Sequence, residues 1–288
     1  MSDTLRLAMA QMTSTNRHAG NVAWLRDAAA RAAAEGAAML ALPEASGFVN
    51  RDREDALPHV TDHADDPFVA ACREVAAKHG LWVHTGSTPV KGPDGVDGAR
   101  FLNHSDLIDP TGRIVAGYDK IHLFDIFLDG KPPTGESRRY GPGARAVLAE
   151  TPWGPVGMSV CYDLRFPGLY RDYAQAGATI LFIPSAFTIP TGRAHWEILL
   201  RARAIENGAF VVAPAQVGHH DDGRDTWGHS MIVGPWGEVL ADMGGTDPGV
   251  VVVDLDMGQV TAARRQIPSL LNGRPYDFTR AADPAAAE

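Results

Sequence analysis

The stretch that decides the fold is VGMSVCYDLRFP, residues 156–167, in which a short apolar run ends directly on a cysteine. Residues 156–160 are apolar and bounded by turn-forming residues, which favours a buried strand. Runs of the same character lie on both sides of it. They predict further strands at 5–12, 37–42, 81–87, 101–108, 113–118, 179–183, 210–213, 229–233 and 250–255.

Helices are predicted between these strands, at 21–35, 67–79, 168–176 and 194–207. The second begins on Pro67 and ends before Gly80, the usual order of helix start and stop signals. Two groups of strands interleaved with helices suggest two sheets packed face to face with helices outside. The pattern equally describes one doubly wound α/β sheet. We expect one domain over residues 1–279 and a disordered tail at 280–288.

Composition excludes several classes of function. The 288-residue chain is 45% apolar and carries a formal net charge of −9, with no block of Lys and Arg that would predict nucleic-acid binding. No apolar run approaches the roughly 18 residues of a membrane helix. The two cysteines, Cys72 and Cys161, give no disulfide framework, so we expect a reducing cytoplasm. The histidines at 219–220 lie between glycines in a predicted loop, and we expect no metal and no cofactor.

Three polar residues each follow an apolar strand, the place where α/β folds gather their sites: Glu44, Lys120 and Cys161. Taken singly, such a Glu or Lys is usually a surface charge and such a Cys is usually packed. Together they supply a base, a cation and a nucleophile. A carboxylate can take the thiol proton, and an ammonium can stabilise the oxyanion that forms when the thiolate attacks a carbonyl.

The segments around these residues resemble the three signature blocks of the nitrilase, or carbon–nitrogen hydrolase, superfamily. They are LALPEASGF (40–48), YDKIHLFD (118–125) and SVCYDLRFP (159–167), supported by similarity at 183–216 and 227–244. The similarity extends over residues 5–267 and is greatest to the Nit branch, which includes ω-amidase and deaminated glutathione amidase. It implies a four-layer αββα sandwich that forms a homodimer or a higher homo-oligomer.

The resemblance also implies roles for the site residues. Glu44 would be the general base, Lys120 the oxyanion stabiliser and Cys161 the nucleophile. Glu136, in the loop after the lysine block, would orient Lys120 or the substrate amide. The expected reaction is hydrolysis of an amide through a Cys161 thioester with release of ammonia, and the backbone N–H of Tyr162 would help to hold the oxyanion.

Residues after the nucleophile bear on the substrate. Tyr162-Asp163 stands where nitrile-cleaving members more often carry Trp-Glu, which favours an amide. Arg165 could grip a substrate carboxylate or form a structural ion pair with Asp163 or another acid. Phe187 and Thr191 resemble pocket-lining positions.

A small carboxylated amide, such as an ω-amide of a keto acid or deaminated glutathione, is therefore the expected substrate. An N-carbamoyl hydrolase, a nitrilase, an acyltransferase and a non-catalytic binding relative remain alternatives.

Overall fold

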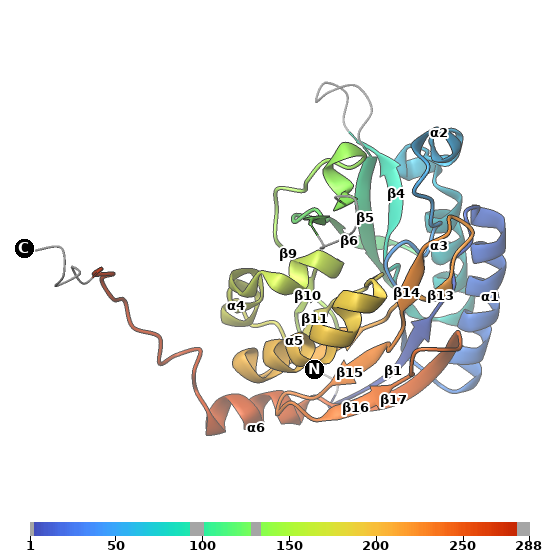
Figure 1. Cartoon of the computed structure of the whole chain (residues 1–288). Helices are drawn as coiled ribbons and strands as arrows, with labels where there is room; N and C mark the ends of the chain where they lie inside the picture. The colour runs from blue at the N-terminus through green and yellow to red at the C-terminus, as the bar shows by residue number, and fades with distance from the viewer. Residues whose placement is uncertain (1–2, 93–100, 128–133, 281–288) are drawn as a thin grey trace, which may run out of the picture.

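Two β-sheets pack face to face in the computed structural model of the chain, with helices against their outer faces (Figure 1). The structure describes residues 3–92, 101–127 and 134–280. The predicted tail at 280–288 lies outside the described residues except for its first residue. The four-layer αββα sandwich is thereby confirmed, and the alternative of a single doubly wound sheet is excluded.

The first sheet has the strand order β17-β1-β2-β3-β5-β4, and β6 pairs with β5. Its strands are β1 (Thr4–Gln11), β2 (Met39–Ala41), β3 (Trp82–His84), β4 (Thr88–Lys91), β5 (Phe101–Ile108), β6 (Ile114–Asp119) and β17 (Gly249–Asp256). The second sheet has the order β16-β15-β12-β11-β10-β9. It comprises β9 (Val147–Ala149), β10 (Val156–Met158), β11 (Ile180–Phe182), β12 (Phe210–Ala213), β15 (Met231–Val233) and β16 (Val239–Asp242).

Two small hairpins border the site. They are β7 (Asp125–Ile126) with β8 (Thr134–Gly135), and β13 (Val217–His219) with β14 (Asp225–Trp227). The centre of each large sheet is parallel: β1, β2 and β3 in the first, and β10, β11 and β12 in the second. Parallel strands end at one edge, so chemistry-bearing residues that follow them are brought together there.

Strand β1 shows why its sequence suits a sandwich. Its side chains alternate between two apolar layers, because successive residues of a strand point to opposite faces. Leu5 and Leu7 join the cluster that lies between the sheets, whereas Ala8 and Ala10 pack beneath the helices. Both faces are thus buried, which explains the nearly continuous apolar run.

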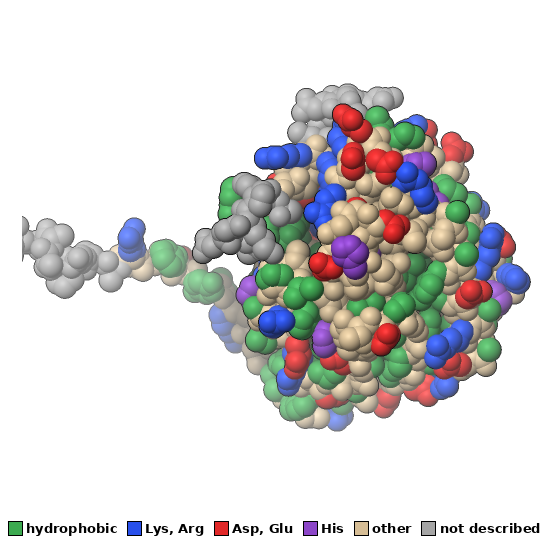
Figure 2. Space-filling view, turned by 45° about the vertical axis from the view of Figure 1, so that its right-hand side comes forward, with side chains coloured by type: hydrophobic (Ala, Val, Ile, Leu, Met, Phe, Trp, Pro, Cys, Tyr) green, Lys and Arg blue, Asp and Glu red, His purple; other side chains and the backbone are tan. Residues whose placement is uncertain are grey.

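Helices α1 (His18–Ala34) and α3 (Pro67–His79) cover the first sheet, with α3 at its predicted bounds. Helices α4 (Pro167–Gln175) and α5 (Ile189–Asn207) cover the second sheet. Short α2 (Arg53–Ala56) and α6 (Gly258–Gln266) were not predicted. Within the described ranges, none of the helices is of a length and apolarity that would span a bilayer. Acidic and basic side chains are interspersed on the face shown in Figure 2.

Helix α5 begins five residues before its predicted start at residue 194. Pro190 lies in the first turn, where proline needs no N–H partner, so it starts the helix and does not block it. Glycine usually destabilises a helix, but Gly192 is needed here for close packing. A Cβ there would lie 2.2 Å from Cγ of Trp227, so the glycine lets the helix approach β14.

His84 on β3 makes the stability of the fold depend on pH. Its ring is fully buried and stacks on Phe182 with 4.5 Å between centroids. Burial lowers the pKa of His84 from its ordinary 6.5 to about 3. The unfolded chain therefore binds this proton at a higher pH than the folded chain does. Stability should fall as the pH drops from 6.5 towards 3, by roughly 1.4 kcal/mol per pH unit from this group.

Urea unfolding of the wild type and His84→Gln at pH 7 and pH 5 measures that contribution. We expect the wild type to lose more unfolding free energy between the two pH values than the variant does. Equal losses in the two proteins would contradict the assignment.

Candidate active site

Cys161 is the first residue of the short 3-10 helix η4 (Cys161–Arg165) and lies on the sharp turn that follows strand β10. Its φ angle is +52°, in the left-handed region that non-glycine residues rarely adopt. The backbone N–H of Cys161 donates to the carbonyl oxygen of Pro184 at 2.9 Å, which ties this turn to the end of β11. Strained backbone of this kind persists where the surroundings enforce it, and here it presents the thiol to a cavity.

Asp163 is the residue that enforces the turn. Its carboxylate is fully buried and accepts four hydrogen bonds. Oδ2 accepts from the Tyr118 hydroxyl at 2.7 Å and from the Val160 N–H at 2.8 Å. Oδ1 accepts from the backbone N–H and the ring Nδ1 of His122, at 3.0 and 2.7 Å. The carboxylate therefore joins the nucleophile turn to the segment after β6, which carries Lys120.

Glu44 follows strand β2 of the opposite sheet and is 6% exposed. Its Oε1 accepts from Lys120 Nζ and from Asn103 Nδ2, both at 3.0 Å. Its Oε2 accepts from the backbone N–H of Ala186 at 2.8 Å. These donors fix the carboxylate in one orientation between the two sheets.

Lys120 lies at the end of β6 and is 2% exposed. Besides Glu44, its ammonium donates to both carboxylate oxygens of Glu136, at 2.9 and 3.1 Å. Glu136, in the 3-10 helix η3 (Glu136–Arg138), is itself held by the N–H of Phe124 at 2.6 Å. Burial disfavours the charged form of Lys120, but the carboxylates of Glu136 and Glu44 outweigh it and hold the pKa of Lys120 well above its usual range. Lys120 therefore serves as a fixed positive charge and not as a base.

The resting state of the nucleophile is a thiol. Burial and the nearby Glu44 carboxylate raise the pKa of Cys161 well above its usual range, although Lys120 and the Ala186 N–H act in the opposite direction. The thiolate must therefore form when a base accepts the proton. Glu44 is the carboxylate that interacts with the thiol, which makes it the base of this arrangement.

These groups line a cavity of about 280 Å³. Six of the eight residues predicted for the site lie on its wall: Glu44, Lys120, Glu136, Cys161, Tyr162 and Phe187. Apolar side chains form much of the rest of the wall, as is usual for small-molecule sites. Three arginines also line it, Arg51, Arg139 and Arg224. Arg51 and Arg224 both face the Asp222 carboxylate, at 3.9 and 2.8 Å, so among the described residues Arg139 is the arginine on this wall that is available to an anionic ligand.

Arg165 and Thr191 are not among the described residues that line the cavity. Its guanidinium lies over the rings of Tyr162 and Phe187, at 5.9 and 5.6 Å, and contacts His195 Nδ1 at 3.3 Å. The alternative of an ion pair with Asp163 fails because Tyr118, His122 and Val160 surround that carboxylate. Thr191 Oγ1 bonds Thr188 Oγ1 at 2.8 Å within the first turn of α5.

Sequence patterns missed several groups of the site. Asn103, on the inner face of β5, bridges Glu44 and Glu136 at 3.0 and 3.5 Å. Its alternation with Leu107 on β5 was the available signal for an inward side chain. The Ala186 donor is a backbone group, so its residue type carries no signal.

His219 and His220, which the sequence does not predict to be metal ligands, each have a protein partner. His219 pairs with Asp225 at 2.8 Å, while buried His220 bonds the Ser14 carbonyl at 2.9 Å and the Thr226 hydroxyl at 2.8 Å. Among the described residues, one group of three has the spacing of metal ligands: His63, His104 and Asp106. It lies outside the cavity wall.

Comparison with known proteins gives consistent matches. The model of the carbon-nitrogen hydrolase family matches residues 6–265. The human protein named deaminated glutathione amidase is 39% identical over 93% of this chain and 82% of its own length. The crystal structure of the C. elegans NitFhit protein superposes with a TM-score of 0.86 and 36% identity, covering 95% of this chain and 66% of that one.

The amidase from Nesterenkonia sp. AN1 is 28% identical, with a TM-score of 0.74 over 92% of this chain and 98% of its own. The structure compared is a glutamate-to-glutamine mutant that shows the result of Michael addition of acrylamide at the active-site cysteine.

Proposed function

The chain belongs to the carbon–nitrogen hydrolase family, and we propose that it hydrolyses a small amide carrying a carboxylate, through a thioester on Cys161. It is an amidase, a hydrolase of carbon–nitrogen bonds other than peptide bonds. The observation that carries the proposal is the cavity whose wall holds a thiol, a buried carboxylate, a buried ammonium and the Arg139 guanidinium.

The first half of the reaction forms the thioester. Glu44 takes the proton of Cys161, and the thiolate attacks the carbonyl carbon of the amide. The negative charge that develops on the carbonyl oxygen is stabilised by the Lys120 ammonium and by the N–H of Tyr162. The C–N bond then breaks, and the nitrogen leaves with the proton that Glu44 had taken.

The second half restores the enzyme. Glu44, again a carboxylate, accepts a proton from water as the water oxygen attacks the thioester carbonyl. The C–S bond breaks, the acid product leaves, and the Glu44 proton returns to the Cys161 sulfur. Glu136 takes no proton in this scheme. Its bidentate contact holds Lys120 at the distance from Glu44 that both halves require.

The substrate carboxylate is assigned to Arg139. Arg224 already pairs with Asp222 at 2.8 Å, and Arg51 lies 3.9 Å from the same carboxylate. Among described residues Arg139 has no acidic partner, since it donates to the Asn50 carbonyl at 2.8 Å and stacks on Tyr140. A guanidinium of this kind at a cavity wall suits a carboxylate. An ω-amide of a keto acid and deaminated glutathione both meet these requirements, and the name of the human relative supports the second.

Replacing Arg139 by Gln should therefore weaken substrate binding and leave the chemical step nearly intact. Loss of one charge-assisted contact is worth about 1.5–3 kcal/mol, which corresponds to a rise in KM of roughly 10- to 150-fold. Steady-state kinetics with an ω-amide measures it, and exposed Arg138→Gln is the matched control. An unchanged KM for the carboxylated amide in Arg139→Gln would contradict the assignment.

An amide panel tests the proposed function. Ammonia or amine release is measured with ω-amides of keto acids, deaminated glutathione, their methyl esters, carbamoyl amino acids and nitriles. We expect the carboxylated amides to be cleaved fastest and their esters far more slowly. Preferred turnover of a nitrile or a carbamoyl compound, transfer to an added amine in place of water, or turnover of none of them would each refute it.

The assembly and compartment are also proposals. We infer a homodimer in the cytoplasm, supported by the free thiols of Cys72 and Cys161 and by exposed apolar side chains along α5 and the β15–β16 turn. These are Ile198, Ile205 and Trp236, exposed by 70%, 52% and 56%. Sedimentation equilibrium should give twice the chain mass of 30.8 kDa, and a monomer would refute the dimer.

A further inference from the structure

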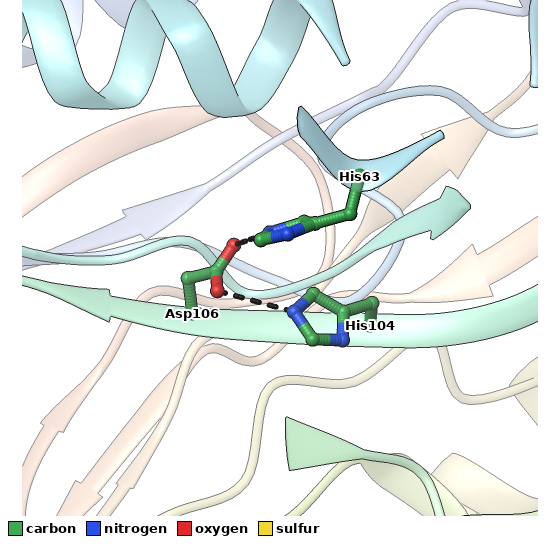
Figure 3. A group of neighbouring side chains, drawn as sticks. All are labelled: His63, His104 and Asp106. Atoms are coloured by element: carbon green, nitrogen blue, oxygen red, sulfur yellow. Dashed lines mark hydrogen bonds and ion pairs between the residues drawn. The ribbon is translucent and has the colours of Figure 1, made fainter. Parts of the chain in front are cut away.

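His63, His104 and Asp106 converge on the outer face of the first sheet (Figure 3), and none of the three lines the amidase cavity. His63 comes from the 3-10 helix η2 (His63–Asp65), while His104 and Asp106 are two residues apart on β5. The Nε2 atom of His63 lies 2.9 Å from Asp106 Oδ2, and that of His104 lies 3.1 Å from Asp106 Oδ1. All ligand atoms lie within 4.8 Å of one another.

Two further features of this cluster are typical of metal sites. Asp119, directly opposite His104 on β6, bonds His104 Nδ1 at 2.7 Å. A carboxylate on the second nitrogen is the usual outer partner of a metal-bound imidazole, because it fixes the ring and its tautomer. Gly117 keeps the neighbouring space clear, since a Cβ there would lie 3.2 Å from His104 Nε2 and 3.4 Å from Asp106 Oδ1.

We propose that His63, His104 and Asp106 bind a divalent transition-metal ion, and that the preferred ion is Zn²⁺. Two imidazoles and a carboxylate are three of the ligands that tetrahedral zinc takes, with water as the fourth. Tetrahedral bonds of about 2.0 Å place neighbouring ligand atoms about 3.3 Å apart, close to the two distances above. The negative charges of Asp106 and Asp119 balance the ion.

Access and charge support binding from solution. The His63 side chain is 35% exposed and the Asp106 side chain 1%, so the ion would enter past His63 and meet a buried carboxylate. Metal–ligand bonds would replace the two hydrogen bonds to Asp106.

The site would act on the two strands that carry catalytic groups. Asn103 and Lys120 directly adjoin His104 and Asp119 in sequence, and the Lys120 N–H donates to the Asn103 carbonyl at 3.0 Å. Side chains alternate along each strand, so the metal ligands face outward where Asn103 faces the cavity. A bound ion would therefore clamp β5 to β6 behind the amidase site without contacting substrate.

Titration with Co²⁺ tests the proposal, because cobalt replaces zinc and absorbs visible light when four- or five-coordinate. The protein used is Cys161→Ala, which removes the cavity thiol as a competing metal ligand. We expect one equivalent bound, displacement by Zn²⁺, and a higher melting temperature with metal. His63→Gln should lose the visible band, and Asp119→Asn should weaken affinity about 10- to 100-fold.

His219→Gln is the matched control, since it removes a histidine from an exposed His–Asp pair that has no third ligand among the described residues. It should bind cobalt as the parent protein does. Circular dichroism and melting without metal establish that the His63→Gln protein is folded. Absence of a one-equivalent band, or an unchanged band in folded His63→Gln, would overturn the proposal.

Discussion

Replacing Cys161 by Ala should reduce amide turnover by about 10⁴-fold or more, because no second thiol lines the cavity within the described part of the chain. Arg139 would remain in place and bind the substrate carboxylate, so the loss should appear in kcat. Assays of ammonia or amine release measure it, and acrylamide mass labelling gives a second measurement. We expect one adduct in the wild type and none in Cys161→Ala.

The second cysteine provides the control. Cys72 is fully buried on α3, and burial raises the pKa of its thiol well above the usual range. Cys72→Ala should therefore retain its activity and its single acrylamide adduct. Substantial turnover by Cys161→Ala, or labelling that persists without Cys161, would disprove the role of this residue.

Of the substitutions proposed, Asp163→Asn should cause the largest decrease in the free energy of unfolding. The carboxylate accepts four hydrogen bonds in a fully buried position, and an amide nitrogen there would face donors that it cannot satisfy. Removing one charged partner from such a buried arrangement lowers the free energy of unfolding by about 3–5 kcal/mol. Because the same bonds hold the Cys161 turn, turnover should also fall at temperatures where the variant is still folded.

Urea unfolding measures this effect against Asp254→Asn, which removes one partner of an exposed ion pair with Arg6. That control should change the unfolding free energy by no more than about 1 kcal/mol. If Asp163→Asn matched the control in both stability and turnover, Asp163 would have no special part in holding the nucleophile turn.

The parts of the fold that repeat regularly could be predicted from sequence. Helix α3 is predicted at its observed bounds because proline and glycine mark its two ends. The strand-end positions of Glu44, Lys120 and Cys161 also lead to the site, since parallel strands end at a common edge. Helix α5 is predicted too short because its first turn carries helix-weakening residues. The role of one of them, Gly192, depends on Trp227, 35 positions away in the chain.

Contacts between distant segments could not be predicted in the same way. Arg165 is predicted at the substrate from its position four residues after the nucleophile, but that position gives no sign of its contacts with Tyr162, Phe187 and His195. Asp163 gives no sign of its role in the sequence, since Tyr118 and His122 come from another part of the chain. Arg139, the alternative cation, lies in a loop whose path residue patterns do not specify.

Glu44 comes from one sheet, and its two oxygens are held by Lys120 of that sheet and by the Ala186 amide of the other. Catalytic activity therefore depends on the distance between the two sheets. In a mild denaturant the halves could loosen by a fraction of an ångström with every strand and helix intact. Activity would then be lost at a lower denaturant concentration than the far-ultraviolet circular dichroism signal. The activity would thus measure the separation of the two sheets.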